Sequence, residues 1–264
     1  MSTALTVQRR QPESLNTKQI FNFVFGELIM KKLAFFALSA FAAAAMAAGP
    51  VSPSTITISG TSNQTAAITG STISNKSNAS NTAMQNLASN AGDIQIKGTS
   101  NQTVVTSGSI AVNEAVNRND WADQNISSNA GKVEVAKGGT SNQLTSLIGT
   151  TVSNKAKGGD AEALQNLASN NGNGIMITGK SNQFVGGMSS SVFNTADGAQ
   201  ARATQNLSSN FGKVTIAGVS NQSTSLVGSS VLNMALGRNS HAIQNIASND
   251  ACDEPKDPCP NGCR

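Results

Sequence analysis

The feature that most constrains this chain is an internal repeat of about 39 residues, present five times. The tripeptide Ser-Asn-Gln recurs at spacings of 38, 41, 40 and 39 residues, starting at Ser62, Ser100, Ser141, Ser181 and Ser220. A second marker, Gln-Asn-x-[Ala/Ser]-Ser-Asn, keeps nearly the same spacing and starts at Gln85, Gln124, Gln165, Gln205 and Gln244. Such self-similarity indicates a stacked architecture in which each unit packs on its neighbours.

The residue types alternate inside each unit, which indicates strands. In the second unit the alternate positions are Ile94, Ile96, Gly98, Ser100 and Gln102. A later run, Ala-x-Gln-x-[Leu/Ile]-x-Ser, repeats the alternation in all five units. A period of two places these side chains on one face of an extended chain. Glycines between the two runs predict chain reversals at Gly70, Gly108, Gly149 and Gly228, with Ser189 in the fourth unit.

Recurring amides on the inward face point to hydrogen-bonded ladders. A lone buried amide costs about 1–3 kcal/mol when unsatisfied, whereas amides repeated at a strand spacing of ~4.8 Å bond along the stack. We expect three self-assembly ladders. The first holds Gln64, Gln102, Gln143, Gln183 and Gln222. The second holds Asn75, Asn113, Asn154, Asn194 and Asn233, and the third holds Gln85, Gln124, Gln165, Gln205 and Gln244.

The predicted fold is therefore all-β, a β-solenoid or β-arcade with parallel, in-register stacking and a cross-β arrangement on assembly. Its five units are residues 55–92, 93–131, 132–173, 174–212 and 213–249. Whether one unit forms one layer or two is left open. A disordered polar stalk is the main alternative, since Ser, Asn, Gly and Thr dominate the composition. An ordinary globular domain is disfavoured by the strict period and by the few aromatic residues after position 47.

The N-terminal segment is typical of a secretory signal. Met30 is followed by two lysines, an apolar run over 33–48 and an Ala-x-Ala end at 45–47. We predict a signal peptide at 30–47, a short linker at 48–54 and secretion through the periplasm to the cell surface. Residues 1–29 are interpreted as an upstream extension from a misplaced start, the alternative being a genuine extended leader.

Charge and chemistry give little support to binding or catalytic functions. Without residues 1–47 the chain has 13 basic and 12 acidic residues, so we expect no nucleic-acid partner. Residues 174–181 match a phosphate-binding loop, but they occupy ordinary repeat positions. His241 is the only histidine. Acids such as Asp120, Asp123, Asp160 and Asp197 are assigned to solvated turns. We expect no enzymatic activity, catalytic residues, cofactor, metal or small-molecule substrate.

The C-terminal tail, residues 250–264, is Pro-rich and holds all the cysteines, namely Cys252, Cys259 and Cys263. In an oxidising compartment disulfides are expected, and three thiols leave one over. The pairing is Cys259 with Cys263 or Cys252 with Cys259. The odd thiol either links subunits or is handled by oxidoreductases during export, and a zinc site is the weaker alternative.

The segment 228–237, Gly-Ser-Ser-Val-Leu-Asn-Met-Ala-Leu-Gly, followed by Gln244-Asn245, resembles repeats of Fap-type bacterial functional amyloids and, more loosely, curlin repeats. The resemblance covers about residues 55–249. It implies an extracellular fibre subunit for biofilm matrix and adhesion, with itself, an outer-membrane export pore and minor or nucleating subunits as partners. The contiguous units and the long repeat depart from both patterns. The alternative function is a monomeric surface adhesin with a β-solenoid stalk.

Overall fold

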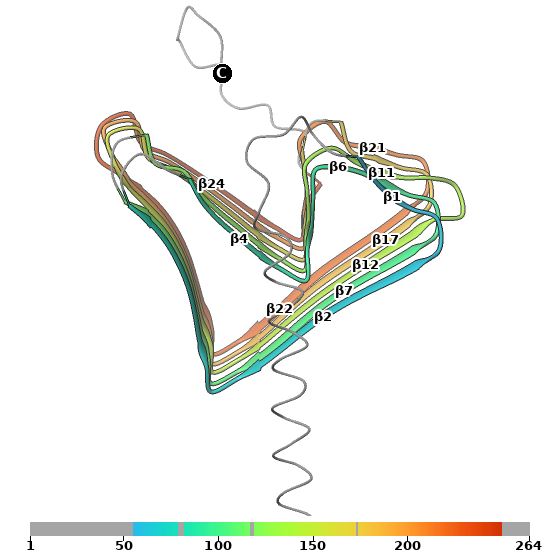
Figure 1. Cartoon of the computed structure of the whole chain (residues 1–264), viewed down its shortest axis with the longest axis horizontal. Coiled ribbons are helices and arrows are strands. Elements are labelled where there is room, and N and C mark those ends of the chain that lie inside the picture. The colour runs from blue at the N-terminus through green and yellow to red at the C-terminus, as the bar shows by residue number, and fades with distance from the viewer. Residues whose placement is uncertain (1–54, 79–81, 117–118, 173, 250–264) are drawn as a thin grey trace, which may run out of the picture. The chain divides into compact units, whose positions relative to one another are not determined.

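The computed structural model describes residues 55–78, 82–116, 119–172 and 174–249. Over these residues the chain is all-β and winds into a solenoid of five stacked layers (Figure 1). Each repeat makes one layer, which answers the question that the sequence left open. The layers are numbered 1 to 5 in chain order. The leader, the linker and the cysteine-bearing tail lie outside the described residues.

Equivalent strands of successive layers form parallel sheets, which we number I to V in chain order. Sheet I contains β1 (Thr55–Ile58), β6 (Asp93–Ile96), β11 (Val133–Val135), β16 (Met176–Ile177) and β21 (Thr215–Ile216). Sheet II contains β2 (Thr61–Thr69), β7 (Thr99–Ser107), β12 (Thr140–Ile148), β17 (Lys180–Met188) and β22 (Val219–Val227). Sheet III contains β3 (Thr72–Asn78), β8 (Ile110–Val116), β13 (Thr151–Gly158), β18 (Ser191–Gly198) and β23 (Ser230–Leu236).

The last two sheets complete each layer. Sheet IV contains β4 (Ala83–Leu87), β9 (Ala122–Ile126), β14 (Glu162–Leu167), β19 (Arg202–Leu207) and β24 (His241–Ile246). Sheet V is short and contains β5 (Asn90–Ala91), β10 (Asn129–Ala130), β15 (Asn170–Asn171) and β20 (Asn210–Phe211). Among the described residues no helix is long and apolar enough to cross a membrane.

The register follows the sequence markers. In sheet II every Ser-Asn-Gln stacks on the next one, as Ser141 pairs with Ser100 below and Ser181 above. Burial alternates along β12, where Ser141, Gln143, Thr145 and Leu147 are buried and the residues between them are not. The predicted all-β solenoid with parallel, in-register strands is confirmed.

Small and branched apolar side chains fill the interior. Val104, Leu147, Val152 and Leu167 belong to one cluster between sheets II, III and IV. Where sheets III and IV face each other the cluster is almost all alanine, including Ala115, Ala156 and Ala196. Alanine lets the two sheets approach closely, so a tightly packed interior forms with few aromatic residues.

Two corners of each layer have a residue with φ near 50°, in the left-handed conformation. Between sheets II and III it occurs at the predicted glycines, such as Gly149 with φ 54°, and at Ser189 with φ 51°. Between sheets IV and V it occurs at small residues, Ala88, Ser127, Ala168, Ser208 and Ala247, with φ between 47° and 49°. The sequence marker therefore carries an Ala or Ser at the sharp corner.

A glycine column explains the string that matches a phosphate-binding loop. Gly98, Gly139, Gly179 and Gly218 stack so closely that an added Cβ would lie 2.1–2.3 Å from a carbonyl oxygen of the preceding layer. Gly179 is thus required by the stack. The string falls on β16 and β17, and Ser181 is fully buried while Lys180 faces outward. A strand follows Gly179 where a phosphate loop would lead into a helix.

Candidate functional site: the amide ladders and the two end layers

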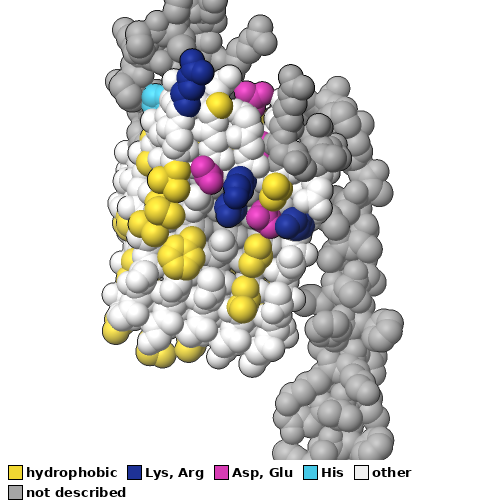
Figure 2. Space-filling view, turned by 90° about the vertical axis from the view of Figure 1, so that its left-hand side faces the viewer, with side chains coloured by type: hydrophobic (Ala, Val, Ile, Leu, Met, Phe, Trp, Pro, Cys, Tyr) yellow, Lys and Arg dark blue, Asp and Glu magenta, His cyan; other side chains and the backbone are white. Residues whose placement is uncertain are grey.

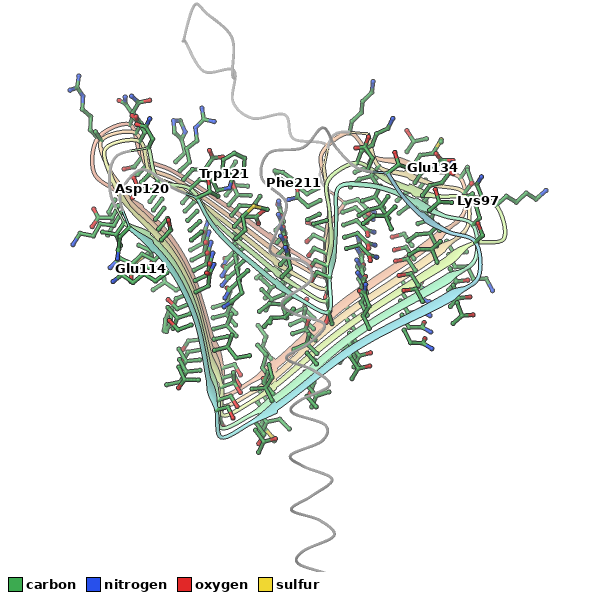
Figure 3. All side chains as sticks on the ribbon, viewed as in Figure 1. Lys97, Glu114, Asp120, Trp121, Glu134 and Phe211 are labelled. Atoms are coloured by element: carbon green, nitrogen blue, oxygen red, sulfur yellow. The ribbon has the colours of Figure 1, made fainter. Side chains whose placement is uncertain are left out.

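The Asn75 column forms one continuous ladder inside the solenoid (Figure 3). Each Nδ2 donates to the Oδ1 of the next layer over 2.7–2.9 Å, through Asn75, Asn113, Asn154, Asn194 and Asn233. The same Nδ2 atoms reach backbone carbonyls of sheet IV, as Asn154 does to Leu164 at 2.9 Å. These carbonyls fix which end of each amide carries the nitrogen.

The Gln85 column forms a second ladder with the opposite direction. Each Nε2 donates to the Oε1 of the glutamine in the preceding layer over 2.6–2.8 Å. The first such bond runs from Gln124 to Gln85 and the last from Gln244 to Gln205. The inner members Gln124, Gln165 and Gln205 are fully buried. Stacking therefore satisfies amides that would be costly in a single layer.

Three further ladders were not anticipated from the sequence. They start at Asn63, Asn86 and Asn90, and each continues through all five layers with Nδ2–Oδ1 distances of 2.7–3.0 Å. All three asparagines belong to the two sequence markers, so their recurrence was visible. Asn63 lies on an outward position, where a solvated side chain is the ordinary expectation. Asn86 has the same parity relative to Gln85, yet its column is fully buried at Asn125, Asn166 and Asn206.

The glutamines of Ser-Asn-Gln differ from expectation. They share a column, but their Nε2 atoms donate across the interior to sheet V and its preceding corner. Gln143 donates to the Ser169 carbonyl and to Asn170 Oδ1, each over 3.1 Å. Gln64, Gln102, Gln183 and Gln222 turn the same way. The Asn90 ladder is within reach and competes for the amide, so these glutamines support that ladder and do not form one.

The ladders are polar, so the two ends of the stack differ chemically. In the Asn63, Gln85 and Asn86 columns the N–H groups point toward layer 1. In the Asn75 and Asn90 columns they point toward layer 5. Layer 1 therefore presents N–H groups at Asn63 and Asn86 and an oxygen at Asn75. Layer 5 presents the matching oxygens at Asn221 and Asn245. It also presents the Asn233 Nδ2, which already donates to the Ala203 and Ile243 carbonyls, as the inner members of this column donate to theirs.

The end layers are open copies of the inner contacts. Strands of layers 1 and 5 pair on one side only in the described sheets. Asn154 is fully buried, whereas its layer 5 counterpart Asn233 is half-buried. Gly60 heads the close-packed glycine column, yet a Cβ added there meets nothing within 4 Å. Each end thus holds a preformed strand edge with unfinished ladders.

Charged side chains that share a column alternate in sign. Lys76 and Glu114 form an ion pair of 3.0 Å, and Lys155 continues that column. Lys157 stacks beside Asp197 in the next layer. Like charges in register about 4.8 Å apart would repel, so this pattern favours the observed register.

Asp123 is a buried acid inside β9, and the sequence-based assignment to a solvated turn was wrong. The assignment was also wrong for Asp120, which is buried just before β9, and for Asp197, which lies inside β18. Asp160 is exposed between β13 and β14. The neighbours of Asp123 in its column are the apolar Met84 and Leu164. Burial raises the pKa of its carboxyl from 3.8 to about 7, and the charge of Glu162 adds to the rise against a hydrogen bond from Asn125. The adjacent columns hold the Gln85 and Asn86 ladders, so a charge here affects the stack.

Other chemistry is sparse in the described part of the chain. No group of three or more His, Cys, Asp or Glu residues gathers there in a way that could hold a metal ion. His241 is exposed at the start of β24. Cys252, Cys259 and Cys263 lie outside the described residues, so their pairing stays a prediction.

Comparisons with protein-family models, with curated proteins and with solved structures find no match. The functional interpretation therefore rests on the geometry of the ladders and of the two end layers.

Proposed function

We propose that this protein is the structural subunit of an extracellular amyloid-like fibre, built by head-to-tail stacking of solenoids. The observation that carries the proposal is the chemical match between the two end layers. Where layer 5 presents an oxygen, layer 1 presents an N–H, and the Asn75 column offers the reverse pair. An incoming copy would continue the ladders and the backbone pairing without changing a side chain.

The same match sets the orientation of the incoming copy. Two layer 5 ends brought together would have antiparallel strands, so the oxygens that end the Asn63, Gln85 and Asn86 columns would not meet the N–H groups of the same columns. The same holds for the N–H groups of two opposed layer 1 ends. Both arrangements leave buried amides unsatisfied, at about 1–3 kcal/mol each. Growth is therefore polar, and the new interface repeats the contacts already present between layers inside one chain.

The wider biology is part of the proposal. The signal-like segment 30–47 supports secretion, and the resemblance to functional amyloids supports a role in biofilm matrix and surface adhesion. The proposed partners are further copies of the chain, an outer-membrane export pore and nucleating subunits. The protein would act by assembly and not as an enzyme. A monomeric adhesin with a solenoid stalk is the competing function, and it predicts a chain that stays soluble.

The fibre proposal is tested at the exposed end of the Gln85 ladder. Gln244 is exposed in layer 5, so Gln244→Lys leaves the inner layers intact and removes the oxygen that an incoming Gln85 needs. We expect fibre growth, followed by thioflavin fluorescence and electron microscopy, to slow at least about tenfold. Lys180→Thr, on an outward position, is the matched control and should grow normally.

Two outcomes would reject the proposal. One is a Gln244→Lys protein that elongates as fast as the unmodified chain. The other is an unmodified chain that stays monomeric at high concentration in the presence of fibre seeds, which would favour the adhesin stalk. Replacing Gln124 and Gln165 together by Lys serves as a stronger version, because it stacks two buried like charges about 4.8 Å apart.

A further inference from the structure

The outer face of sheet II is regular and nearly uncharged, with large apolar side chains among Thr, Ser and Asn. Its five strands are nine residues long and pair without a register break. Among the described residues, seven of the fifteen large hydrophobic side chains that are exposed lie on these strands. They include Val105, Leu144, Ile148, Phe184, Met188 and Val227, which are 36–64% exposed. Leu144 and Phe184 stack in one column and Ile148, Met188 and Val227 in another, and exposed apolar side chains gathered in this way mark an interaction site.

The neighbouring sheet III shows that this is a property of one face. The strands of sheet II contain a single charged residue, Lys180, whereas those of sheet III contain five, namely Lys76, Glu114, Lys155, Lys157 and Asp197. Figure 2 shows basic and acidic side chains among the hydrophobic ones on the side of sheet III. Charges on an exposed sheet oppose sideways association, and sheet II almost lacks them.

The sheet II face has a groove that runs along the stack. A groove of about 480 Å³ crosses layers 2 to 5 and is lined by residues 101–103, 142–144, 182–184 and 221–223. One side of the groove is formed by the outward Asn63 ladder, and the other side by the column that contains Leu144 and Phe184. Beyond it, the Phe184 ring lies over Gly186, 3.0 Å from where a Cβ would be.

We propose that the outer face of sheet II binds the same face of a second copy, so that two stacks run side by side. Its columns repeat once per layer, about every 4.8 Å, and only a partner with the same spacing can match them along their whole length. Another copy of this chain has that spacing. The face measures about 24 Å by about 30 Å, or roughly 700 Å², which is close to one side of a standard protein interface.

Side-chain sizes fit such a pairing. A two-fold axis parallel to the stack reverses the strand direction across the interface. The outward Asn63 column then faces the column of Ala67, Val105, Ser146, Gly186 and Ser225, which consists mostly of small residues. Asparagines therefore oppose mostly small residues, and the central column holding Leu144 and Phe184 meets its own counterpart, so that its apolar side chains contact one another. Lys180 lies at the rim, where its ammonium group stays hydrated.

The side-by-side pairing is a contact separate from head-to-tail stacking. It rests on the proposed function in one respect only, because fibre growth sets how long two paired stacks become. Leu144→Lys with Ser225→Lys adds two positive charges to the sheet II face, in layers that do not touch. Ser153→Lys with Leu232→Lys adds the same charges to outward positions of sheet III in the same layers. We compare the mass per length of fibres by electron microscopy, using chain collected after export from a bacterial host.

The unmodified chain and the sheet III variant should give two chains per ~24 Å of fibre, and the sheet II variant should give one. A single stack in unmodified fibres would overturn the pairing, as would an unchanged mass per length in the sheet II variant. If the unmodified chain does not polymerise, the fibre proposal fails separately. Sedimentation of the soluble chain then decides the pairing: a dimer lost only in the sheet II variant supports it, and a monomer at every concentration rejects it.

Discussion

The inner layers and the end layers have nearly the same sequence but different surroundings. In layer 3, Asn154 and Gln165 are fully buried and bonded on both sides. In layer 5, the equivalent Asn233 is half-buried and Gln244 is exposed. The difference comes from the missing neighbour, since the residue types are the same. An end layer therefore has the sequence of an inner layer but lacks one neighbouring layer, and this contrast can be measured.

The largest effect is expected at the glycine column. Gly179→Ala would place a Cβ 2.3 Å from the Gly139 oxygen, so layers 3 and 4 must separate and lose hydrogen bonds. We expect the free energy of unfolding to fall by about 4 kcal/mol or more in chemical denaturation. Gly159→Ala, where an added Cβ meets nothing within 4 Å, is the control. Equal stability of the two variants would contradict the close approach of the layers.

A buried charge should be the next largest effect. Because the pKa of Asp123 is raised to about 7, the folded chain retains a proton that the unfolded chain releases above pH 3.8. Stability is then greatest at low pH and falls as the pH rises from about 4 to about 7, by roughly 3–4 kcal/mol. Asp123→Asn should remove this loss and be the more stable protein at pH 8.

The measurement is urea denaturation of both proteins at several pH values. Asp197→Asn, on sheet III beside Lys157, is the control substitution. A parallel pH profile for the unmodified chain and Asp123→Asn would show that the carboxyl is hydrated in the folded state.

The ladder itself gives a smaller difference between inner and end layers. Asn154→Ala leaves the Nδ2 of Asn113 and the Oδ1 of Asn194 without their ladder partner, whereas Asn233→Ala deprives one neighbour only. We expect the inner substitution to cost the soluble chain about 2 kcal/mol more. In fibres the two should cost the same, because stacking turns layer 5 into an inner layer. Dissociation of fibres by denaturant makes that comparison.

The smallest effect concerns the corner between sheets II and III. Ser189 holds a left-handed conformation, φ 51°, that glycine holds in the other four layers. Ser189→Gly should raise the melting temperature, with a gain of about 1 kcal/mol. Gly149→Ser, at the same corner one layer earlier, should lower stability by a similar amount. If Ser189→Gly instead lowered stability and Gly149→Ser raised it, contacts of the serine side chain would outweigh the cost of its left-handed backbone conformation.

Most of the fold was predictable because the period and the alternation act at every layer. Markers such as Ser141 and Gln165 fix both the register and the inward face. The hydrogen-bond partner of an inward amide was not predictable, as Gln143 shows. The alternation along a strand tells which face a side chain lies on, but not how far away the opposite strand is. The ladder at Asn63, the buried ladder at Asn86 and the burial of Asp123 depend on how the sheets fold over one another, which no local pattern encodes.

The central claim, that the two ends are halves of one interface, is tested most directly at Gly60. In the isolated chain an added Cβ there meets nothing within 4 Å, but in a head-to-tail stack it would meet the preceding copy's Gly218, as Gly218 meets Gly179 within one chain. Seeded growth of Gly60→Ala is compared with that of Gly159→Ala. We predict an unchanged melting temperature for both variants and almost no elongation for Gly60→Ala. Normal elongation of folded Gly60→Ala on unmodified seeds would contradict the claim.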